Sequence, residues 1–199
     1  MNFAVLASGN GSNLQAIITA LKAKKIKANL VVVISDRADA FALVRARKAK
    51  IPTAVINPKD FSDRESFDRV LVDQLKRSSV DFVVLAGFMR ILSGHVIKSY
   101  PNKILNIHPA LLPAFKGAHA IKDAFEYGAK MTGVTVHFVD EQVDHGAIIC
   151  QEPVKILPKD TLKKLEQRIH TIEHKVYPKM IGLFSAGKLK VRGRSVRIA

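Results

Sequence analysis

The stretch Ile104-Leu105-Asn106-Ile107-His108-Pro109 predicts a buried strand that ends in two polar side chains. Successive residues of a strand point to opposite faces, so Asn106 and His108 project from the same face. Pro109 has no backbone N–H and ends the strand. Ligands of open parallel α/β sheets bind outside the carboxyl ends of the strands. An amide and a titratable ring at that position predict a site that handles a carbonyl group, and the alternative is that they only cap the strand end.

Outward from this stretch, apolar runs and amphipathic patterns alternate along the chain. Continuous apolar runs are typical of buried parallel strands, and apolar residues three or four apart are typical of helices packed on a sheet. The rhythm predicts an α/β fold, a three-layer sandwich on a Rossmann-like, mostly parallel sheet. We expect strands at residues 3–7, 30–35, 53–56, 81–86, 103–107, 132–139 and 147–154. We expect helices at residues 14–24, 39–50, 62–77, 93–98, 121–127 and 162–184.

Residues at the element ends carry further expectations. Ser62 is predicted to be the N-cap of the helix over residues 62–77. Gly128 and Gly187 are predicted to end their helices in the position that favours glycine. Residues 188–197 alternate basic and apolar side chains, which predicts an exposed edge strand protected by lysine.

Size and composition limit the class of protein. A chain of 199 residues predicts one domain, and 48% hydrophobic residues suffice for a packed core. No apolar run approaches the ~20 residues that cross a bilayer, and the N-terminus reads as a strand and not as a signal peptide. The only cysteine, Cys150, excludes an intrachain disulfide and predicts a buried, inert thiol. We therefore expect a soluble, cytoplasmic protein without a membrane partner.

The chain is strongly basic, with a formal net charge of +15. Its basic residues are spread along the predicted helices, and no aromatic residues alternate with them as on a base-stacking surface. This distribution favours a solvated basic surface. Attraction of a small polyanionic substrate is the second interpretation, and nucleic-acid binding is the third.

A glycine-rich turn, Ser8-Gly9-Asn10-Gly11-Ser12-Asn13, lies between the first predicted strand and helix. Glycines let backbone amides approach an anion, and the helix N-terminus adds a partial positive charge. Leu14 stands where a dinucleotide fingerprint has its third glycine, and no Gly-Lys-Ser/Thr follows. The turn therefore predicts a site for a phosphate monoester, and the alternative is an ordinary tight turn.

Two further segments carry candidate residues. Asp144, in Asp144-His145-Gly146, can hold an imidazole and raise its pKa, although Asp and Gly also form many ordinary turns. The segment 86–92 could wall a flat aromatic ligand or simply pack on itself. The remaining histidines form no metal-binding motif, so we expect no metal; they include His119, His137, His145, His170 and His174.

In chain order, four motifs resemble those of the phosphoribosylglycinamide formyltransferase family, over residues 1 to about 187. They are Ala7-Ser8-Gly9-Asn10-Gly11-Ser12-Asn13-Leu14-Gln15, Leu85-Ala86-Gly87-Phe88-Met89-Arg90-Ile91-Leu92, Asn106-Ile107-His108-Pro109 with Leu111-Leu112-Pro113, and Gly133-Val134-Thr135-Val136-His137-Phe138-Val139 before Asp144-His145-Gly146. The resemblance implies the formyltransferase fold in a single domain over residues 1–199. Its phosphate-binding part would cover about 1–100, its folate-binding and catalytic part about 101–187, and a basic tail 188–199.

The resemblance also implies an activity and a set of site residues. The formyl group of 10-formyltetrahydrofolate, the co-substrate, would pass to the amine of 5-phosphoribosylglycinamide in de novo purine biosynthesis, by a monomer or a homodimer that needs no metal. The catalytic residues would be Asn106, His108 and Asp144. Residues implied for the phosphoribosylglycinamide are Gly11, Ser12, Asn13, His170 and Glu173. Residues implied for the folate are Arg64, Met89, Arg90, Ile91, Leu92, Asn106, Asp140, Glu141, Gln142, Val143 and Asp144.

Elementary chemistry agrees with this implied catalytic group. The substrate amine attacks the formyl carbon and creates a negative oxygen, to which Asn106 and a protonated His108 can donate hydrogen bonds. His108 can also deliver a proton to the leaving nitrogen, and we expect Asp144 to keep His108 charged near neutral pH. The alternatives within the same fold are formyltetrahydrofolate hydrolase and tRNA-directed formyltransferase, whose additional domains we do not expect here. A basic, non-catalytic nucleic-acid-binding protein is the alternative from another class.

Overall fold

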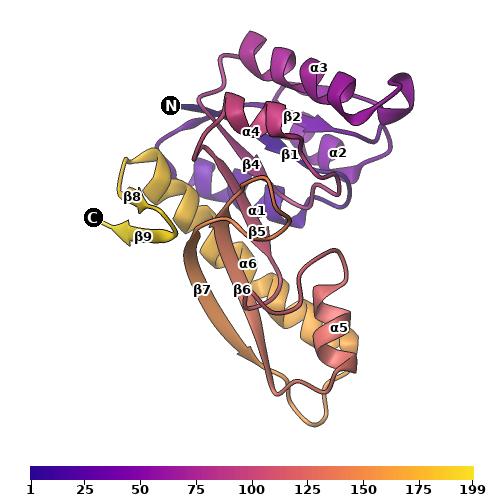
Figure 1. The fold of residues 1–199 in the computed structure, drawn as a ribbon, viewed down its shortest axis with the longest axis vertical. Coiled ribbons are helices and arrows are strands. Elements are labelled where there is room, and N and C mark those ends of the chain that lie inside the picture. Colours follow the sequence, from indigo (N-terminus) through magenta and orange to yellow (C-terminus); the bar gives the residue numbers. More distant parts are fainter.

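A seven-stranded sheet in the order β3-β2-β1-β4-β5-β6-β7 runs through the computed structural model, which describes residues 1–199 (Figure 1). The first five strands pair in parallel, and β6 and β7 add antiparallel pairs at one edge. The sheet is therefore mostly parallel, as predicted. Its strands are β1 (Asn2–Leu6), β2 (Asn29–Ser35), β3 (Thr53–Val55), β4 (Phe82–Leu85), β5 (Ile104–His108), β6 (Met131–Phe138) and β7 (Ile148–Lys155).

Helices cover both faces of the sheet and complete the predicted three layers. One hydrophobic core joins the sheet to α1 (Ser12–Lys22), α2 (Phe41–Lys48) and α6 (Leu162–Ser185). A second core, on the opposite face, joins it to α3 (Arg64–Arg77) and α4 (Gly94–Ser99). Alternation along the strands separates the two cores, because successive strand residues point to opposite faces.

The smaller elements differ in part from the sequence predictions. A 3-10 turn η1 (Pro58–Asp60) precedes α3, and α5 (Ala120–Glu126) follows β5. The prediction of Ser62 as N-cap is wrong: Asp63 caps α3 and accepts a hydrogen bond from the Ser66 N–H at 2.7 Å. The carboxylate of Asp63 can reach that N–H and also favours the positive end of the helix dipole.

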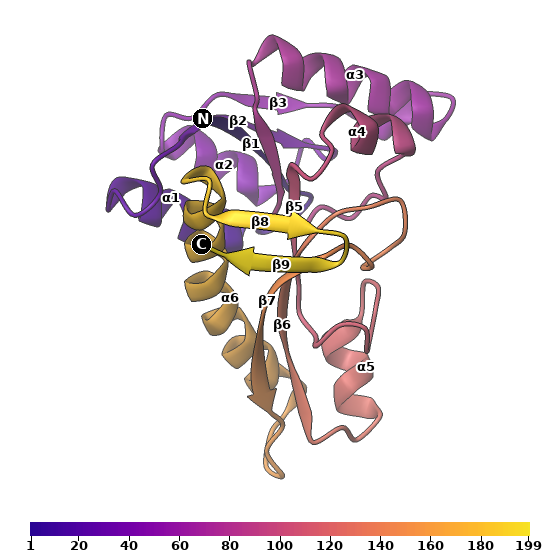
Figure 2. The same cartoon turned by 60° about the vertical axis from the view of Figure 1, so that its left-hand side comes forward.

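The C-terminal segment is a second correction. It does not extend the main sheet as an edge strand but forms its own antiparallel hairpin, β8 (Leu189–Arg192) and β9 (Ser195–Ile198) (Figure 2). Gly187 precedes it with a φ of +70°, and Gly128 follows α5 with a φ of +76°, so both predicted helix ends are confirmed. These left-handed conformations suit glycine because it lacks a Cβ.

The position of β5 decides where the polar side chains of its end point. Leu105 and Ile107 belong to the core under α1 and α6, while Ile104 belongs to the core under α3 and α4. Alternation therefore places Asn106 and His108 on one face, as predicted, and this face is the α3 and α4 side of the sheet. None of the helices combines the length and the apolar composition that a membrane span requires.

Candidate active site

His108, the last residue of β5, meets Asp144 from the loop between β6 and β7. His108 Nδ1 lies 3.3 Å from Asp144 Oδ2, and the two side chains are 5% and 10% exposed. The Gly117 N–H donates to the same carboxylate oxygen at 2.9 Å. The Phe115 carbonyl oxygen lies 2.7 Å from His108 Nε2. Each ring nitrogen of His108 therefore faces an oxygen acceptor, which suits a ring that donates at both nitrogens.

Burial opposes the charged form of this ring. It lowers the pKa of His108 below the ordinary value, although Asp144 and the Phe115 carbonyl each favour the imidazolium. Asp144 thus acts in the expected direction and favours the charged ring, but desolvation of the buried ring has the larger effect on the pKa of His108. Burial also acts to raise the pKa of Asp144, but the nearby His137 side chain, the Gly117 N–H and the His108 ring lower it overall. Asp144 is accordingly the charged member of the pair.

Asn106 is held by a residue that the sequence analysis did not single out. β5 and β6 place His137 directly opposite Asn106, and Asn106 Nδ2 lies 3.1 Å from His137 Nε2. His137 Nδ1 lies 2.7 Å from the Phe138 carbonyl oxygen, which only accepts hydrogen bonds. In the neutral ring Nδ1 therefore carries the proton and Nε2 accepts from the amide. This contact orients the Asn106 amide and leaves its second N–H for a ligand oxygen.

A signal for His137 was present in the sequence. Gly133, Thr135 and His137 alternate with apolar residues, which marks one less apolar face of a strand. Only the pairing of β5 with β6 reveals that this face lies beside Asn106 and His108. Strand partners far apart in sequence cannot be read from local periodicity, and the histidine therefore looked isolated.

The glycine-rich turn joins β1 to α1 and leaves the first amides of that helix open. Gly11 has a φ of +73°, and a Cβ there would lie 2.8 Å from Ala42, so the position requires glycine. No side chain caps α1. Arg45 of α2 holds the turn by donating to the Asn10 carbonyl at 2.9 Å and side-chain oxygen at 3.0 Å. Arg45, which sequence analysis also missed, shares a surface pocket with Ser12.

Three of the residues implied for the phosphoribosylglycinamide are in contact: Asn13 of α1, and His170 and Glu173 of α6. Glu173 Oε2 accepts a hydrogen bond from Asn13 Nδ2 at 3.1 Å and lies 2.8 Å from His170 Nδ1. Glu173 is only 3% exposed, and its hydrogen bond with His170 raises the pKa of that ring. Asn13 therefore ties the start of α1 to α6 beside the glycine-rich turn.

In the segment 89–92, which follows β4, two of the residues implied for the folate are exposed and one is buried. Met89 and Ile91 are 66% and 55% exposed, so both apolar side chains are open to a ligand. Leu92 is 6% exposed and packs in the core under α3 and α4, so its side chain is occupied. Met89 and Ile91 therefore offer apolar surface, while Leu92 offers only its backbone.

This segment is also tied to the glycine-rich turn. The Met89 N–H donates to the Ser8 hydroxyl at 2.9 Å, and the Ser8 N–H donates to the Gly87 carbonyl at 3.0 Å. The Arg90 guanidinium lies 4.4 Å from the centre of the Phe67 ring, a cation–π contact that orients it. The two segments implied for different substrates thus share direct hydrogen bonds.

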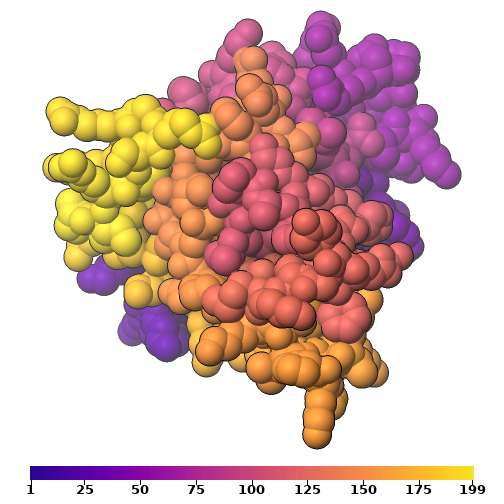
Figure 3. All heavy atoms as spheres, turned by 60° about the horizontal axis from the view of Figure 1, so that its bottom comes forward, coloured from indigo at the N-terminus to yellow at the C-terminus, as the bar shows by residue number.

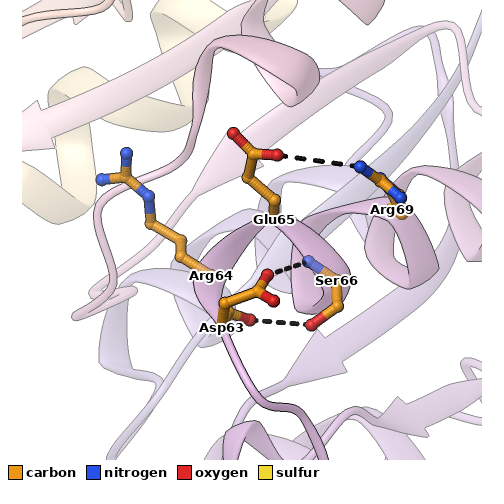
Figure 4. A pocket seen from close by; sticks show the side chains of 5 residues that line it. All are labelled: Asp63, Arg64, Glu65, Ser66 and Arg69. Carbon is orange, nitrogen blue, oxygen red and sulfur yellow. Dashed lines mark hydrogen bonds and ion pairs between the residues drawn. The ribbon is translucent and has the colours of Figure 1, made fainter.

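Arg64 is exposed at the start of α3. It is the first residue of α3 and makes no side-chain hydrogen bond or ion pair. Figure 4 shows it pointing away from the Glu65–Arg69 ion pair, in a polar surface pocket that contains none of the proposed catalytic residues. Of the implied folate loop, Asp140 pairs with His145 at 2.7 Å. The side chains of Glu141, Gln142 and Val143 are exposed. No group of three or more acidic, histidine or cysteine side chains is arranged to hold a metal ion.

Comparison with known proteins places this fold and site in a class. The family described as formyl transferase matches residues 1–181. A solved structure, glycinamide ribonucleotide transformylase 1 from Symbiobacterium toebii, is 46% identical, superposes with a TM-score of 0.97, and shares 100% of this chain and 93% of its own. The chain thus has the fold of a formyl transferase.

Full-length relatives narrow the class further. Phosphoribosylglycinamide formyltransferase from Escherichia coli is 46% identical over 96% of this chain and 90% of its own length. The Bacillus subtilis protein of the same name is 44% identical over 90% of this chain and 92% of its own. The trifunctional purine biosynthetic protein adenosine-3 of Chironomus tentans is 47% identical, and this chain spans only 14% of its length. The chain belongs to the phosphoribosylglycinamide formyltransferase family.

Proposed function

We propose that this chain transfers the formyl group of 10-formyltetrahydrofolate to the amine of 5-phosphoribosylglycinamide. The observation that carries the proposal is the convergence of Asn106, His108 and Asp144 at the carboxyl end of β5, within the fold of this family. The full-length bacterial relatives carry the name of this activity. Their identity over almost the whole chain supports the same substrates here.

The proposed chemistry uses each of the three residues differently. The substrate amine attacks the formyl carbon, and the carbonyl oxygen becomes negative in a tetrahedral intermediate. The free N–H of Asn106 donates to that oxygen, where preorganised donors are worth most because they need no reorientation. His108 carries a proton between the attacking amine and the leaving nitrogen, and the Asp144 carboxylate stabilises the ring while it is charged.

The lowered pKa of His108 fits this proton transfer. A ring that is neutral before reaction can accept the proton of the attacking amine, and its imidazolium form then has Asp144 Oδ2 at 3.3 Å. For the ring to reach substrate through Nε2, the Phe115 carbonyl that faces this nitrogen must give way. We therefore infer that substrate takes the place of the Phe115 carbonyl as the partner of His108 Nε2.

The two substrates would occupy neighbouring surfaces. The open amides of α1 at Gly11 to Asn13 suit the phosphate, and the pair His170 and Glu173 suits the ribose or the glycinamide. Met89 and Ile91 would cover the apolar rings of the folate, with the 140–144 loop on its pterin. Arg64 would pair with a carboxylate of the folate glutamate, which extends from those rings. The Ser8–Met89 hydrogen bond would keep the two surfaces in fixed relation.

An absorbance assay with purified protein tests the proposal. We expect loss of the formyl group from 10-formyltetrahydrofolate only when phosphoribosylglycinamide is present. Asn106→Ala should lower kcat by about 100- to 1000-fold, as for loss of one oxyanion donor. Loss of the formyl group without the acceptor would identify a hydrolase instead, and transfer to tRNA alone would identify a tRNA-directed enzyme. A control variant, Asp73→Ala on the exposed face of α3, should keep the full rate.

A further inference from the structure

The loop that carries Asp144 is held in an unfavourable conformation. We use "Asp144 loop" for residues 139–147, which connect β6 to β7. Asp144 itself has a φ of +47°, in the left-handed region that residues other than glycine rarely adopt. Gly146 closes the base of the loop, where a Cβ would lie 1.9 Å from the Phe138 carbonyl oxygen. Such a conformation persists only when surrounding contacts hold it.

One of these contacts comes from the C-terminal hairpin. Arg194 lies in the turn between β8 and β9, and its Nη2 donates to the His145 carbonyl at 2.7 Å. Its Nη1 lies 3.0 Å from His145 Nε2 and 3.3 Å from Nδ1. These contacts hold His145, the residue that directly follows Asp144. Figure 2 shows the hairpin reaching toward the β6–β7 connection, and in Figure 3 the yellow C-terminal segment lies against the orange segment.

His145 also contacts Asp140 at the other end of the Asp144 loop. His145 Nδ1 lies 2.7 Å from Asp140 Oδ2, so Arg194, His145 and Asp140 form a chain from the hairpin to the far side of the loop. The His145 Nδ1–H can donate to Asp140, while Arg194 Nη1 lies at nearly equal distances from both ring nitrogens and therefore over the ring. The directed hydrogen bond of Arg194 is the one to the His145 carbonyl. An arginine suits this position because its rigid fork can bind a backbone carbonyl and a side chain together.

We propose that Arg194 is a positioning residue that braces the Asp144 loop, and so sets the place of Asp144 beside His108. This inference rests on the proposed function, which makes Asp144 part of the catalytic group and the 140–144 segment part of the folate site. It gives the C-terminal hairpin a role in the reaction. None of the four catalytic or substrate segments recognised in the sequence includes this hairpin.

Because Arg194 is exposed, its substitution should change the kinetic constants only moderately. Its side chain is on the surface, where a charge-assisted hydrogen bond competes with water. We expect Arg194→Gln to lower kcat about three- to tenfold and to raise the KM for 10-formyltetrahydrofolate by a similar factor. The KM for phosphoribosylglycinamide should not change, because the glycine-rich turn and Glu173 lie on other elements.

The matched control is Arg197→Gln. Arg197 belongs to the same hairpin and carries the same charge, but it is exposed and its side chain makes no hydrogen bond or ion pair. Loss of net charge therefore affects both variants equally, and only Arg194→Gln removes the contact with His145. Arg194→Lys keeps the charge but not the fork, so it should resemble Arg194→Gln if bracing matters.

Two readouts on the full-length protein test the inference. Amide hydrogen exchange without substrates should become faster within residues 140–146 in Arg194→Gln and stay unchanged in Arg197→Gln. Steady-state kinetics of Arg194→Gln should show a raised KM for 10-formyltetrahydrofolate and an unchanged KM for phosphoribosylglycinamide. Equal exchange in both variants, equal kinetics in both, or full activity of Arg194→Lys would overturn the proposal. If unmodified protein transferred no formyl group, the proposed function would fail, while faster loop exchange in Arg194→Gln would still support the brace.

Discussion

Asn106 Nδ2 and His137 Nε2 lie 3.1 Å apart across the antiparallel pair β5 and β6. The Phe138 carbonyl fixes the tautomer of His137, and His137 in turn fixes the amide of Asn106. His137 Nε2 also lies 3.7 Å from Asp144 Oδ1. One buried imidazole therefore lies between two members of the proposed catalytic group and is hydrogen-bonded to Asn106.

We predict that His137→Ala lowers kcat by about tenfold, because the Asn106 amide loses the partner that orients its donor. His137→Gln, whose amide oxygen can accept the same hydrogen bond, should recover part of the rate. Steady-state rates and circular dichroism would check both variants. A fully active His137→Ala protein would show that Asn106 needs no such orientation.

Asp144→Asn is predicted to lower kcat by about 100-fold or more, because the variant cannot stabilise a charged His108 during proton transfer. The amide keeps an oxygen that can accept from the Gly117 N–H, so the loop should keep its hydrogen bond. Asp123→Asn, an exposed carboxylate on α5 without a hydrogen-bond partner, is the control. Rates for Asp144→Asn that match this control would contradict the proposed role.

Asn13→Asp should weaken phosphoribosylglycinamide binding by about tenfold while folate binding changes little. The new carboxylate would stand beside the proposed phosphate site and within contact of Glu173, which the Asn13 amide now bonds at 3.1 Å. Like charges so close repel each other as well as the phosphate. Calorimetric titration with each substrate tests the prediction, and equal weakening for both ligands would refute it.

The lowered pKa of His108 predicts a pH-dependent stability. The folded ring resists protonation, whereas in the unfolded chain it takes up a proton near the ordinary value of 6.5. As the pH falls through about 6.5 the unfolded state binds more protons, so the free energy of unfolding decreases. Stability from this group is therefore present above that pH and is lost below it.

Denaturant unfolding of the unmodified protein and of His108→Gln, between about pH 8 and pH 5, measures this contribution. The free energy of unfolding should fall more steeply with acid in the unmodified protein. Comparing the two proteins cancels the opposite trend of His170, whose raised pKa stabilises the fold at low pH. Parallel profiles would mean that burial does not disfavour the charged His108 ring.

Much of the fold could be predicted from short stretches of the sequence. The apolar run over β2, the alternation at β5 and the glycine-rich turn predicted the parallel sheet, the shared face of Asn106 and His108, and the helix that opens after Gly11. These features depend on neighbours within a few residues, so their physical causes lie within a short window of sequence. The edge strand expected at residues 188–197 failed because the basic alternation fits an isolated hairpin equally well.

The amino-acid sequence by itself determined the strand–helix rhythm, the open helix start at Gly11, and which polar residues end β5. Only the tertiary structure decided that His137 faces Asn106, that burial lowers the pKa of His108, and that Arg194 holds the residue after Asp144. Register, desolvation and contacts between distant segments depend on how the whole chain packs, and a local pattern of side chains carries no information about them.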